Sequence, residues 1–206
     1  MREFGKPADD RKGGLRRLLI TGAVLVPIAI AATCIISEVR ELPWWYTVRA
    51  WLGSTEIQYK LGKIYASGES ADDLNKAEKW LRKAAENGSV EAQYELAKNF
   101  VKDDEEKITL LRMAAENDYA KAQYELGLMN FRVEHYETAV EWYQKAAAQG
   151  LREAQHSLAG CLLRGDGIAK DRKKAVELYR KAAEQEYGPA IAQLEQLGEP
   201  EPNADK

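Results

Sequence analysis

Residues 122–127 read Ala-Gln-Tyr-Glu-Leu-Gly, and a version of this phrase occurs four times in the 206-residue chain. The other copies are Ile-Gln-Tyr-Lys-Leu-Gly at 57–62, Ala-Gln-Tyr-Glu-Leu-Ala at 92–97 and Ala-Gln-His-Ser-Leu-Ala at 154–159. Their glutamines are 35, 30 and 32 residues apart. A phrase that returns at this spacing indicates a protein built from small repeated units.

A second phrase follows each copy of the first and ends in a pair of alanines. It reads Trp-Leu-Arg-Lys-Ala-Ala at 80–85, Leu-Leu-Arg-Met-Ala-Ala at 110–115, Trp-Tyr-Gln-Lys-Ala-Ala at 142–147 and Leu-Tyr-Arg-Lys-Ala-Ala at 178–183. Both phrases contain good helix formers with apolar residues three and four positions apart, which predicts two helices per unit. Asn-Gly, Gln-Gly and Gly-Asp-Gly sequences supply the breaks between helices.

One such helix pair is too small to bury its own apolar face, so neighbouring units must stack. We therefore expect an all-α fold: an α–α solenoid of about four helix-turn-helix repeats over residues 54–198. Residues 189–194 read Pro-Ala-Ile-Ala-Gln-Leu and supply only a first helix, which predicts a terminal capping helix. Residues 199–206 are expected to form a polar tail without packing partners.

The two phrases resemble the Sel-one-like repeat (SLR) family, a subclass of the tetratricopeptide-like helical repeats. Residues 122–127 and 139–150 follow the family pattern almost throughout, and residues 170–179 add the start of a second helix. The second unit departs from the pattern, because Lys-Asp-Asp at 102–104 replaces the loop that contains glycine. The resemblance implies a scaffold that holds partner proteins against a concave surface lined by the first helices.

The segment before the repeats has a different composition. Residues 1–17 carry six basic and three acidic side chains, and the nineteen residues from Leu18 to Ile36 carry no charge. A helix of that length reaches roughly 28 Å, close to the hydrocarbon thickness of a bilayer. We therefore expect one transmembrane helix at 18–36. The positive-inside bias of Arg16 and Arg17 makes residues 1–17 a cytoplasmic tail and puts the repeats in the bacterial periplasm, anchored to the inner membrane.

Two further interpretations of the N-terminal region stay open. A basic stretch followed by an apolar run with small residues also describes a cleaved secretory signal, which would leave a soluble periplasmic protein. Residues 37–53 include a Pro-Trp-Trp-Tyr sequence that suits an aromatic belt or a short amphipathic helix at the membrane surface. Alternatively, Trp51 and Leu52 cover the open end of the first repeat.

Charge and spacing exclude several classes of function. Residues 54–206 contain 22 basic and 28 acidic side chains, so nucleic acid has no electrostatic basis for binding there. The two cysteines and two histidines form no cluster at metal-ligand spacing, and the sequence has no phosphate loop or nucleophile elbow. We therefore expect no metal, no cofactor, no small-molecule substrate and no catalytic residue, and hence no enzyme.

The predicted binding residues lie on the first helices. Tyr124 falls about 180° from the packed stripe of Ala122 and Leu126, which predicts that it points away from the core. The equivalent residues in the other units form an aromatic row that offers a large contact area; the alternative is that each one packs against the first helix of the next unit. With their neighbours, the predicted protein-binding residues are Tyr59, Tyr94, Tyr124, His156, Lys63, Lys98, Lys121, Leu128 and Phe131.

These features favour a membrane-anchored scaffold or adaptor that binds one or more proteins. The resemblance also allows an immunity-type inhibitor of a secreted effector such as a lipase, because some bacterial SLR proteins have that role. A hydrolase is the remaining alternative. It is disfavoured because His135 is expected in a loop with neither a nucleophile nor a carboxylate pair spaced to it.

Overall fold

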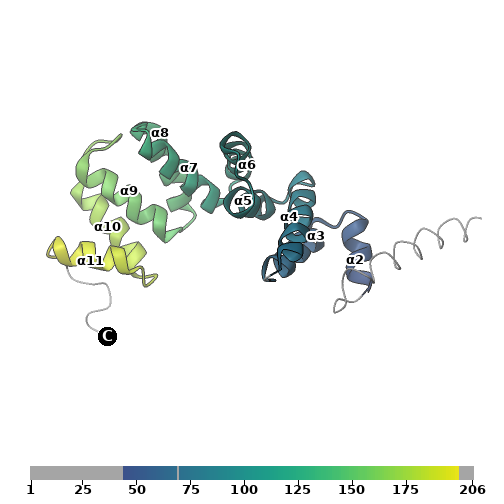
Figure 1. The fold of residues 1–206 in the computed structure, drawn as a ribbon. Helices are drawn as coiled ribbons and strands as arrows, with labels where there is room; N and C mark the ends of the chain where they lie inside the picture. The colour runs from purple at the N-terminus through teal and green to yellow at the C-terminus, as the bar shows by residue number, and fades with distance from the viewer. Residues whose placement is uncertain (1–43, 69, 200–206) are drawn as a thin grey trace, which may run out of the picture. The chain divides into compact units, whose positions relative to one another are not determined.

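Every regular element that the structure describes is a helix. The computed structural model describes residues 44–68 and 70–199, which contain ten helices, α2 to α11, and no strand (Figure 1). The chain forms two compact units, residues 1–58 and residues 59–206. The prediction of an all-α solenoid is therefore confirmed at the level of helix content and order.

The repeats fold as alternating first and second helices, each containing one of the two phrases. The first helices are α3 (Thr55–Ala66), α5 (Val90–Asn99), α7 (Ala120–Arg132) and α9 (Arg152–Arg164). The second helices are α4 (Ala71–Glu86), α6 (Asp104–Glu116), α8 (Tyr136–Ala148) and α10 (Arg172–Ala183). A last helix, α11 (Gly188–Gln196), buries Ala190 and Leu194 and matches the predicted terminal helix.

Short polar side chains cap the start of three of the four second helices, α4, α6 and α10. The side chain of Ser70 accepts a hydrogen bond from the Asp73 amide at 3.0 Å, and the Asp103 carboxylate accepts one from the Glu106 amide at 2.8 Å. Asp171 does the same at the start of α10. These bonds satisfy amides that have no partner inside the helix. The charged sequences around Asp103 and Asp171 are therefore helix starts, as expected.

Each second helix ends in the same way. A residue with positive φ follows the helix, and the next amide donates back to the carbonyl of the first alanine of the pair, which is the Schellman arrangement. Glycine is favoured at such a φ because it has no Cβ, yet an aspartate and a glutamate occupy two of the four positions. The four residues are Gly88, Asp118, Gly150 and Glu186, with φ of 89°, 59°, 87° and 57°.

In three of the four units, the glutamine of the first phrase joins the helix pair to the helix before it. The Nε2 group of Gln93 donates to the carbonyl of Ala85 at 3.3 Å, and that of Gln123 donates to the carbonyl of Ala115 at 3.0 Å. In the first unit, Gln58 makes the same bond to Ala50, near the end of α2 (Trp44–Trp51), at 2.8 Å. Each of these carbonyls also accepts a bond from a backbone amide in the turn that follows the helix, and its second lone pair accepts from the glutamine. This role was not predicted from the sequence.

The oxygen of the same amide is satisfied where a glutamine also follows the second helix. Gln149 donates to Gln123 Oε1 at 2.8 Å, and Gln185 donates to Gln155 Oε1 at 3.0 Å. Asn117 stands at the corresponding place after α6, and its side chain, which is one methylene shorter, donates to the Met113 carbonyl instead. Within the described part of the chain, the buried Oε1 of Gln93 then has no hydrogen-bond partner.

We predict that Asn117→Gln stabilises the protein, because the longer side chain can reach the buried oxygen of Gln93. One additional hydrogen bond to a buried acceptor is worth about 1 kcal/mol. The measurement is the melting temperature, with Asn75→Gln on the exposed side of α4 as the matched control. A melting temperature for Asn117→Gln at or below that of the control would contradict this assignment.

Small residues lie where the two helices of a pair approach most closely. Ala84, Ala114, Ala146 and Ala182 are fully buried, as the close approach of packed helices requires. The tightest contact is at Gly127, where an added Cβ would lie 2.5 Å from Cε1 of Tyr143. The alanines and this glycine therefore have the packing role expected from the sequence.

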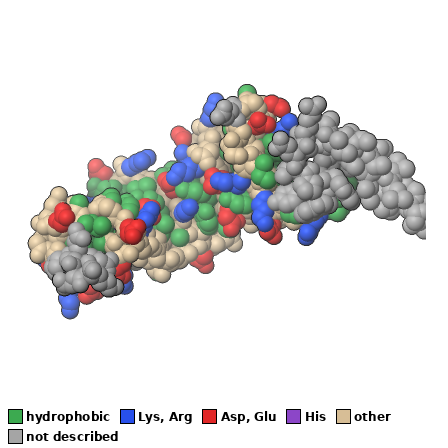
Figure 2. Space-filling model, turned by 90° about the horizontal axis from the view of Figure 1, so that it is seen from below, with side chains coloured by type: hydrophobic (Ala, Val, Ile, Leu, Met, Phe, Trp, Pro, Cys, Tyr) green, Lys and Arg blue, Asp and Glu red, His purple; other side chains and the backbone are tan. Residues whose placement is uncertain are grey.

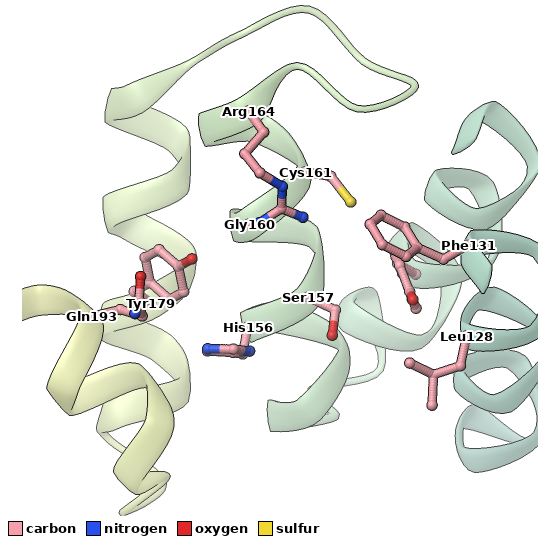
Figure 3. Close-up of a pocket in the computed structure, with 10 residues that line it drawn as sticks. Leu128, Phe131, His156, Ser157, Gly160, Cys161, Arg164, Tyr179 and Gln193 are labelled. Carbon is pink, nitrogen blue, oxygen red and sulfur yellow. The ribbon is translucent and has the colours of Figure 1, made fainter. Parts of the chain in front are cut away.

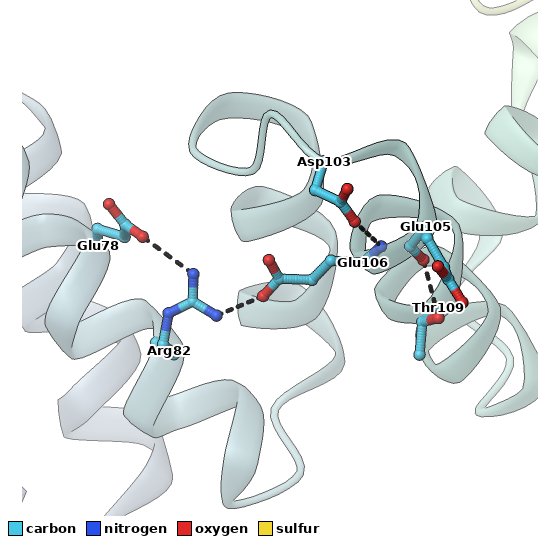
Figure 4. Close-up of polar contacts among 6 residues, drawn as sticks. All are labelled: Glu78, Arg82, Asp103, Glu105, Glu106 and Thr109. Atoms are coloured by element: carbon cyan, nitrogen blue, oxygen red, sulfur yellow. Dashed lines mark hydrogen bonds and ion pairs between the residues drawn. The ribbon is translucent and has the colours of Figure 1, made fainter.

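An ion-pair network links the second helices α4 and α6 (Figure 4). The Arg82 guanidinium on α4 pairs with Glu78 one turn earlier at 3.0 Å and with Glu106 on α6. The hydrogen bond to Glu106, followed by that to Glu78, raises the pKa of Arg82 above its ordinary value. Because all three side chains are partly exposed, this network orients the helices more than it stabilises them.

The membrane anchor predicted at residues 18–36 is not among the residues that the structure describes. The cytoplasmic tail at 1–17, the span at 18–36 and the last seven residues lie outside the described residues. No helix among the residues that are described has the length and apolar character needed to cross a membrane.

Helix α2 falls inside the aromatic segment predicted at 37–53. Among residues 48–51 of α2, for which burial is described, Ala50 is buried and Trp51 is 55% exposed. Leu52, which follows the helix, is 71% exposed, and the chain turns at Gly53, which has a φ of 95°. The interpretation that Trp51 and Leu52 cover the first repeat stays a prediction.

Candidate functional site

The first helices of residues 59–206 carry two neighbouring hollows, on what we call the first-helix face, formed by α5, α7, α9 and α11. The smaller one, the lysine hollow, measures about 160 Å³ and the larger one, the aromatic hollow, about 290 Å³. On the face shown in Figure 2, apolar, acidic and basic side chains are interspersed rather than separated by charge.

The lysine hollow is formed by α5, α7 and the start of α9. Lys98 Nζ donates to the Tyr94 hydroxyl at 3.0 Å and to the Glu125 carboxylate at 2.8 Å. The bond to Glu125, and next the bond to Tyr94, raises the pKa of Lys98 above its ordinary value, so this lysine is charged at neutral pH. The residues that line the lysine hollow are Tyr94, Lys98, Lys121, Tyr124, Glu125, Leu151 and Glu153.

The aromatic row does not simply point away from the core. Tyr94 is only 7% exposed, and its ring centroid lies 5.3 Å from that of Tyr119, which precedes α7 in the next unit. Tyr124 is half-buried and shares a hydrogen bond with Ser157 on the next first helix, α9. The alternative expectation, in which each aromatic residue packs against the next unit, therefore describes Tyr94 and Tyr124 better.

The aromatic hollow extends over α9 from α7 on one side to α11 on the other (Figure 3). Helix α9 contributes the floor, and rings from α7, α8 and α10 contribute the walls. In Figure 3 the Arg164 guanidinium lies beside Gly160, and the Cys161 thiol points toward Phe131. The lining residues are Leu128, Phe131, Tyr143, His156, Ser157, Gly160, Cys161, Arg164, Tyr179 and Gln193.

The thiol and the phenol groups of the aromatic hollow are neutral at pH 7, and burial moves their pKa values further above 7. Burial raises the pKa of the Cys161 thiol to about 11 and also raises the pKa values of Tyr143 and Tyr179. Burial, and next the charge of Arg164, lowers the pKa of His156 below its ordinary value. Among the described residues that line the hollow, Arg164 is consequently the one that carries a charge at neutral pH.

The thiol and the imidazole side chains of this region can be described individually. A thiol with a raised pKa is a poor nucleophile, because the thiolate is the reactive form. In the described residues no group of three or more His, Cys, Asp or Glu side chains is placed to hold a metal ion. His135 is exposed at the N-cap position of α8, and its side chain makes no capping hydrogen bond to the helix. The face offers aromatic contact area and fixed charges to a partner.

Seven of the nine predicted binding residues line the two hollows. Tyr94, Lys98, Lys121 and Tyr124 line the lysine hollow, and Leu128, Phe131 and His156 line the aromatic hollow. The other two lie on α3, where Lys63 pairs with Glu95 at 3.3 Å and Tyr59 packs against the core beside α5. No observation shows a partner at any of the nine, so their binding role stays a prediction.

Sequence reasoning missed Arg164 and the tyrosines of the second helices, Tyr143 and Tyr179. These two tyrosines were assigned no role of their own from the sequence, yet their rings form walls of the aromatic hollow. Arg164 follows Gly160 by four residues, which puts both on one helix face. That spacing is a signal which could have identified the pair.

Comparison with known proteins agrees with this architecture. The profile of the Sel1 repeat family matches residues 56–89, 120–151 and 152–187. The chain is a Sel1-repeat protein. The unmatched unit at 90–119 still folds as the helix pair α5 and α6, so this Sel1-repeat protein contains one pair whose sequence departs from the family pattern.

Solved structures of Sel1-repeat proteins share the fold. The protective antigen c5321 of uropathogenic Escherichia coli, which displays an SLR fold, superposes with a TM-score of 0.67 at 37% identity, over 74% of this chain and 35% of that one. A Sel1 repeat protein of Oxalobacter formigenes superposes with a TM-score of 0.67 at 28% identity, over 74% and 67%. The immunity protein Pa5087 of Pseudomonas aeruginosa superposes with a TM-score of 0.52 at 26% sequence identity, over 70% of this chain and 59% of that one. This Sel1-repeat protein thus spans about a third of the length of c5321.

Proposed function

We propose that this Sel1-repeat protein is a non-enzymatic scaffold or adaptor that binds a partner protein on its first-helix face. The observation that carries the proposal is the pair of adjacent hollows on that face, which combine aromatic rings with fixed charges. Aromatic and arginine side chains are the types that contribute most to protein–protein binding. The membership of the Sel1-repeat family supports protein partners as a class.

The proposal is tested by affinity capture with two matched variants of the full chain. Leu128→Glu puts a charge into the aromatic hollow, whereas Met113→Glu puts one on an exposed apolar residue of the second helix α6. We expect the proteins captured by the wild type to be lost with Leu128→Glu and kept with Met113→Glu, provided both variants melt like the wild type. Equal capture by the two variants would refute binding on the first-helix face.

A second candidate function is that of an immunity-type inhibitor. It is favoured by the similarity to the immunity protein Pa5087, at 26% identity and a TM-score of 0.52. The outcome of the capture separates the two functions: a single tight partner whose enzymatic activity falls on binding supports the inhibitor, and several components of one complex support the scaffold. Hydrolytic turnover by the purified chain itself, lost with His135→Ala, would overturn both.

We also propose that residues 18–36 anchor the protein in a bacterial inner membrane, with the repeats in the periplasm. The support is the uncharged stretch from Leu18 to Ile36 and the basic residues before it. Protease added to spheroplasts is expected to degrade the repeats, and the intact chain is expected in the membrane fraction. Protection of the repeats would reverse the orientation, and a mature chain that begins after this stretch would support a cleaved signal.

A further inference from the structure

The first helices α3, α5 and α7 share an ion-pair pattern. A lysine five residues after the buried glutamine of one first helix reaches a glutamate two residues after the glutamine of the next. Lys63 pairs with Glu95 at 3.3 Å, and Lys98 pairs with Glu125 at 2.8 Å. Each pair lies across the boundary between two repeats.

The pattern stops between α7 and α9. The residue five positions after Gln123 is Leu128, and the residue two positions after Gln155 is Ser157, so this boundary has no ion pair of that kind. The corresponding position on α9 is Gly160, which has no side chain at all. These three residues all line the aromatic hollow, which therefore opens where the ion-pair pattern is interrupted.

Because Gly160 has no side chain, the guanidinium of Arg164 has room to lie against the helix at this position. An added Cβ at Gly160 would lie 3.2 Å from Nη1 and 3.6 Å from Nη2 of Arg164, so the guanidinium lies directly over this glycine (Figure 3). Its carbon is 5.8 Å from the centroid of the Phe131 ring. Asp166 accepts a hydrogen bond from Nε at 2.6 Å, and the two Nη groups lie on the side of Gly160.

The contents of the aromatic hollow define which chemistry fits it. Rings and aliphatic groups form its walls, and Arg164 is the charged group among the described residues that line it. A guanidinium forms its strongest hydrogen bonds with carboxylates, which it can bind through two N–H groups at once. The volume of about 290 Å³ is small for a folded element and suits one or two side chains of a bound segment.

We propose that the aromatic hollow binds a segment of a partner protein in which an apolar side chain and an aspartate or glutamate lie within a few residues of each other. The apolar side chain packs between Leu128 and Phe131, and the carboxylate pairs with the Nη groups of Arg164 above Gly160. This assignment rests on the proposed function, because it specifies the partner chemistry of the same face.

The test is a selection of random peptides displayed on phage against the full chain in detergent micelles. We expect the enriched peptides to combine an apolar residue with a nearby acidic one. The strongest peptide is then synthesised with its acidic residue intact and with that residue changed to the neutral amide. Dissociation constants of both peptides are measured by fluorescence anisotropy with the wild type and with each variant.

Three variants test the charge and the position of Arg164. Arg164→Gln removes the charge and keeps hydrogen-bonding groups, Gly160→Ala shifts the guanidinium by a few tenths of an ångström, and Arg112→Gln removes a charge from an exposed position on α6 as the control. We expect Arg164→Gln to weaken binding of the acidic peptide roughly ten- to hundredfold, as loss of a charged hydrogen bond does. Gly160→Ala should weaken this binding much less than Arg164→Gln does, and Arg112→Gln should leave it unchanged. The amide peptide should no longer distinguish the wild type from Arg164→Gln.

The outcomes distinguish this inference from the proposed function. Enriched peptides that lack acidic residues, or that bind Arg164→Gln as tightly as the wild type, would overturn the role of Arg164. If Leu128→Glu still abolished their binding, the first-helix face would remain the interaction site. Failure to enrich any peptide that Leu128→Glu loses would overturn both proposals.

Discussion

The substitution Gly167→Ala is expected to destabilise the protein more than any other single change considered. Gly167 lies in the loop between α9 and α10 with a φ of 66°. An added Cβ would lie 2.3 Å from the carbonyl carbon and 2.4 Å from the carbonyl oxygen of Tyr136, and 2.5 Å from the amide nitrogen of Glu137. These are backbone atoms at the start of α8, which cannot move aside as the end of a side chain can.

Two effects therefore add at this position. A residue with a Cβ at positive φ is strained, and the contact with α8 forces the loop away from the preceding repeat. Together they are expected to lower the free energy of unfolding by about 3 kcal/mol. In a chain of this size that corresponds to a fall in melting temperature of roughly 6 to 12 °C.

Gly150→Ala is the matched control for Gly167→Ala. Gly150 has a φ of 87°, but an added Cβ there meets no atom within 4 Å. Its substitution therefore carries the backbone strain without the contact, and the fall in melting temperature should be clearly smaller. Equal falls for the two variants would show that the loop between α9 and α10 does not pack against α8 as described.

Gln123→Leu is expected to be the second most destabilising change. The side chain of Gln123 is fully buried, donates to the Ala115 carbonyl at 3.0 Å and accepts from Gln149 at 2.8 Å. Leucine fills a similar volume but removes both of these hydrogen bonds, and the Ala115 carbonyl keeps only its bond from the Asp118 amide at 3.2 Å. Each lost hydrogen bond is worth about 1 kcal/mol, so the two together cost about 2 kcal/mol. The melting temperature should fall accordingly, and amide protons in the last turn of α6 should exchange faster.

The exposed residue Gln144 on α8 provides the control, since Gln144→Leu changes the same atoms without removing a buried bond. We expect this variant to melt within a degree or two of the wild type. If Gln123→Leu behaved in the same way, the buried glutamines would not couple successive helix pairs, and Asn117→Gln would have no reason to stabilise the protein.

The helix pairs were predictable because their determinants are local. The spacing of apolar residues, the alanine pair and the glycines after it are all visible within one unit, and they correctly predicted α3 to α10. The bond from Gln123 to Ala115 was not predictable in the same way. It depends on how the first helix of one pair meets the end of the preceding second helix, and periodicity alone gives a buried glutamine no partner.

The predicted site residues lie close together in the structure, and their binding role stays a prediction. Leu128, Phe131 and His156, which were selected from the sequence, line one hollow. Helical angles could not show that Tyr94 is buried against Tyr119, because that contact comes from the next unit. Nor could they show that Arg164 lies over Gly160, which depends on the rotamer of a long side chain.

Photo-crosslinking in cells tests the central claim most directly, namely that partners bind on the first-helix face. A photoreactive phenylalanine analogue is placed at Leu128 in the aromatic hollow in one variant and at the exposed Gln144 of α8 in another. We predict discrete crosslinked adducts from position 128 and none of them from position 144. The same adducts from both positions, or adducts from position 144 alone, would contradict the account.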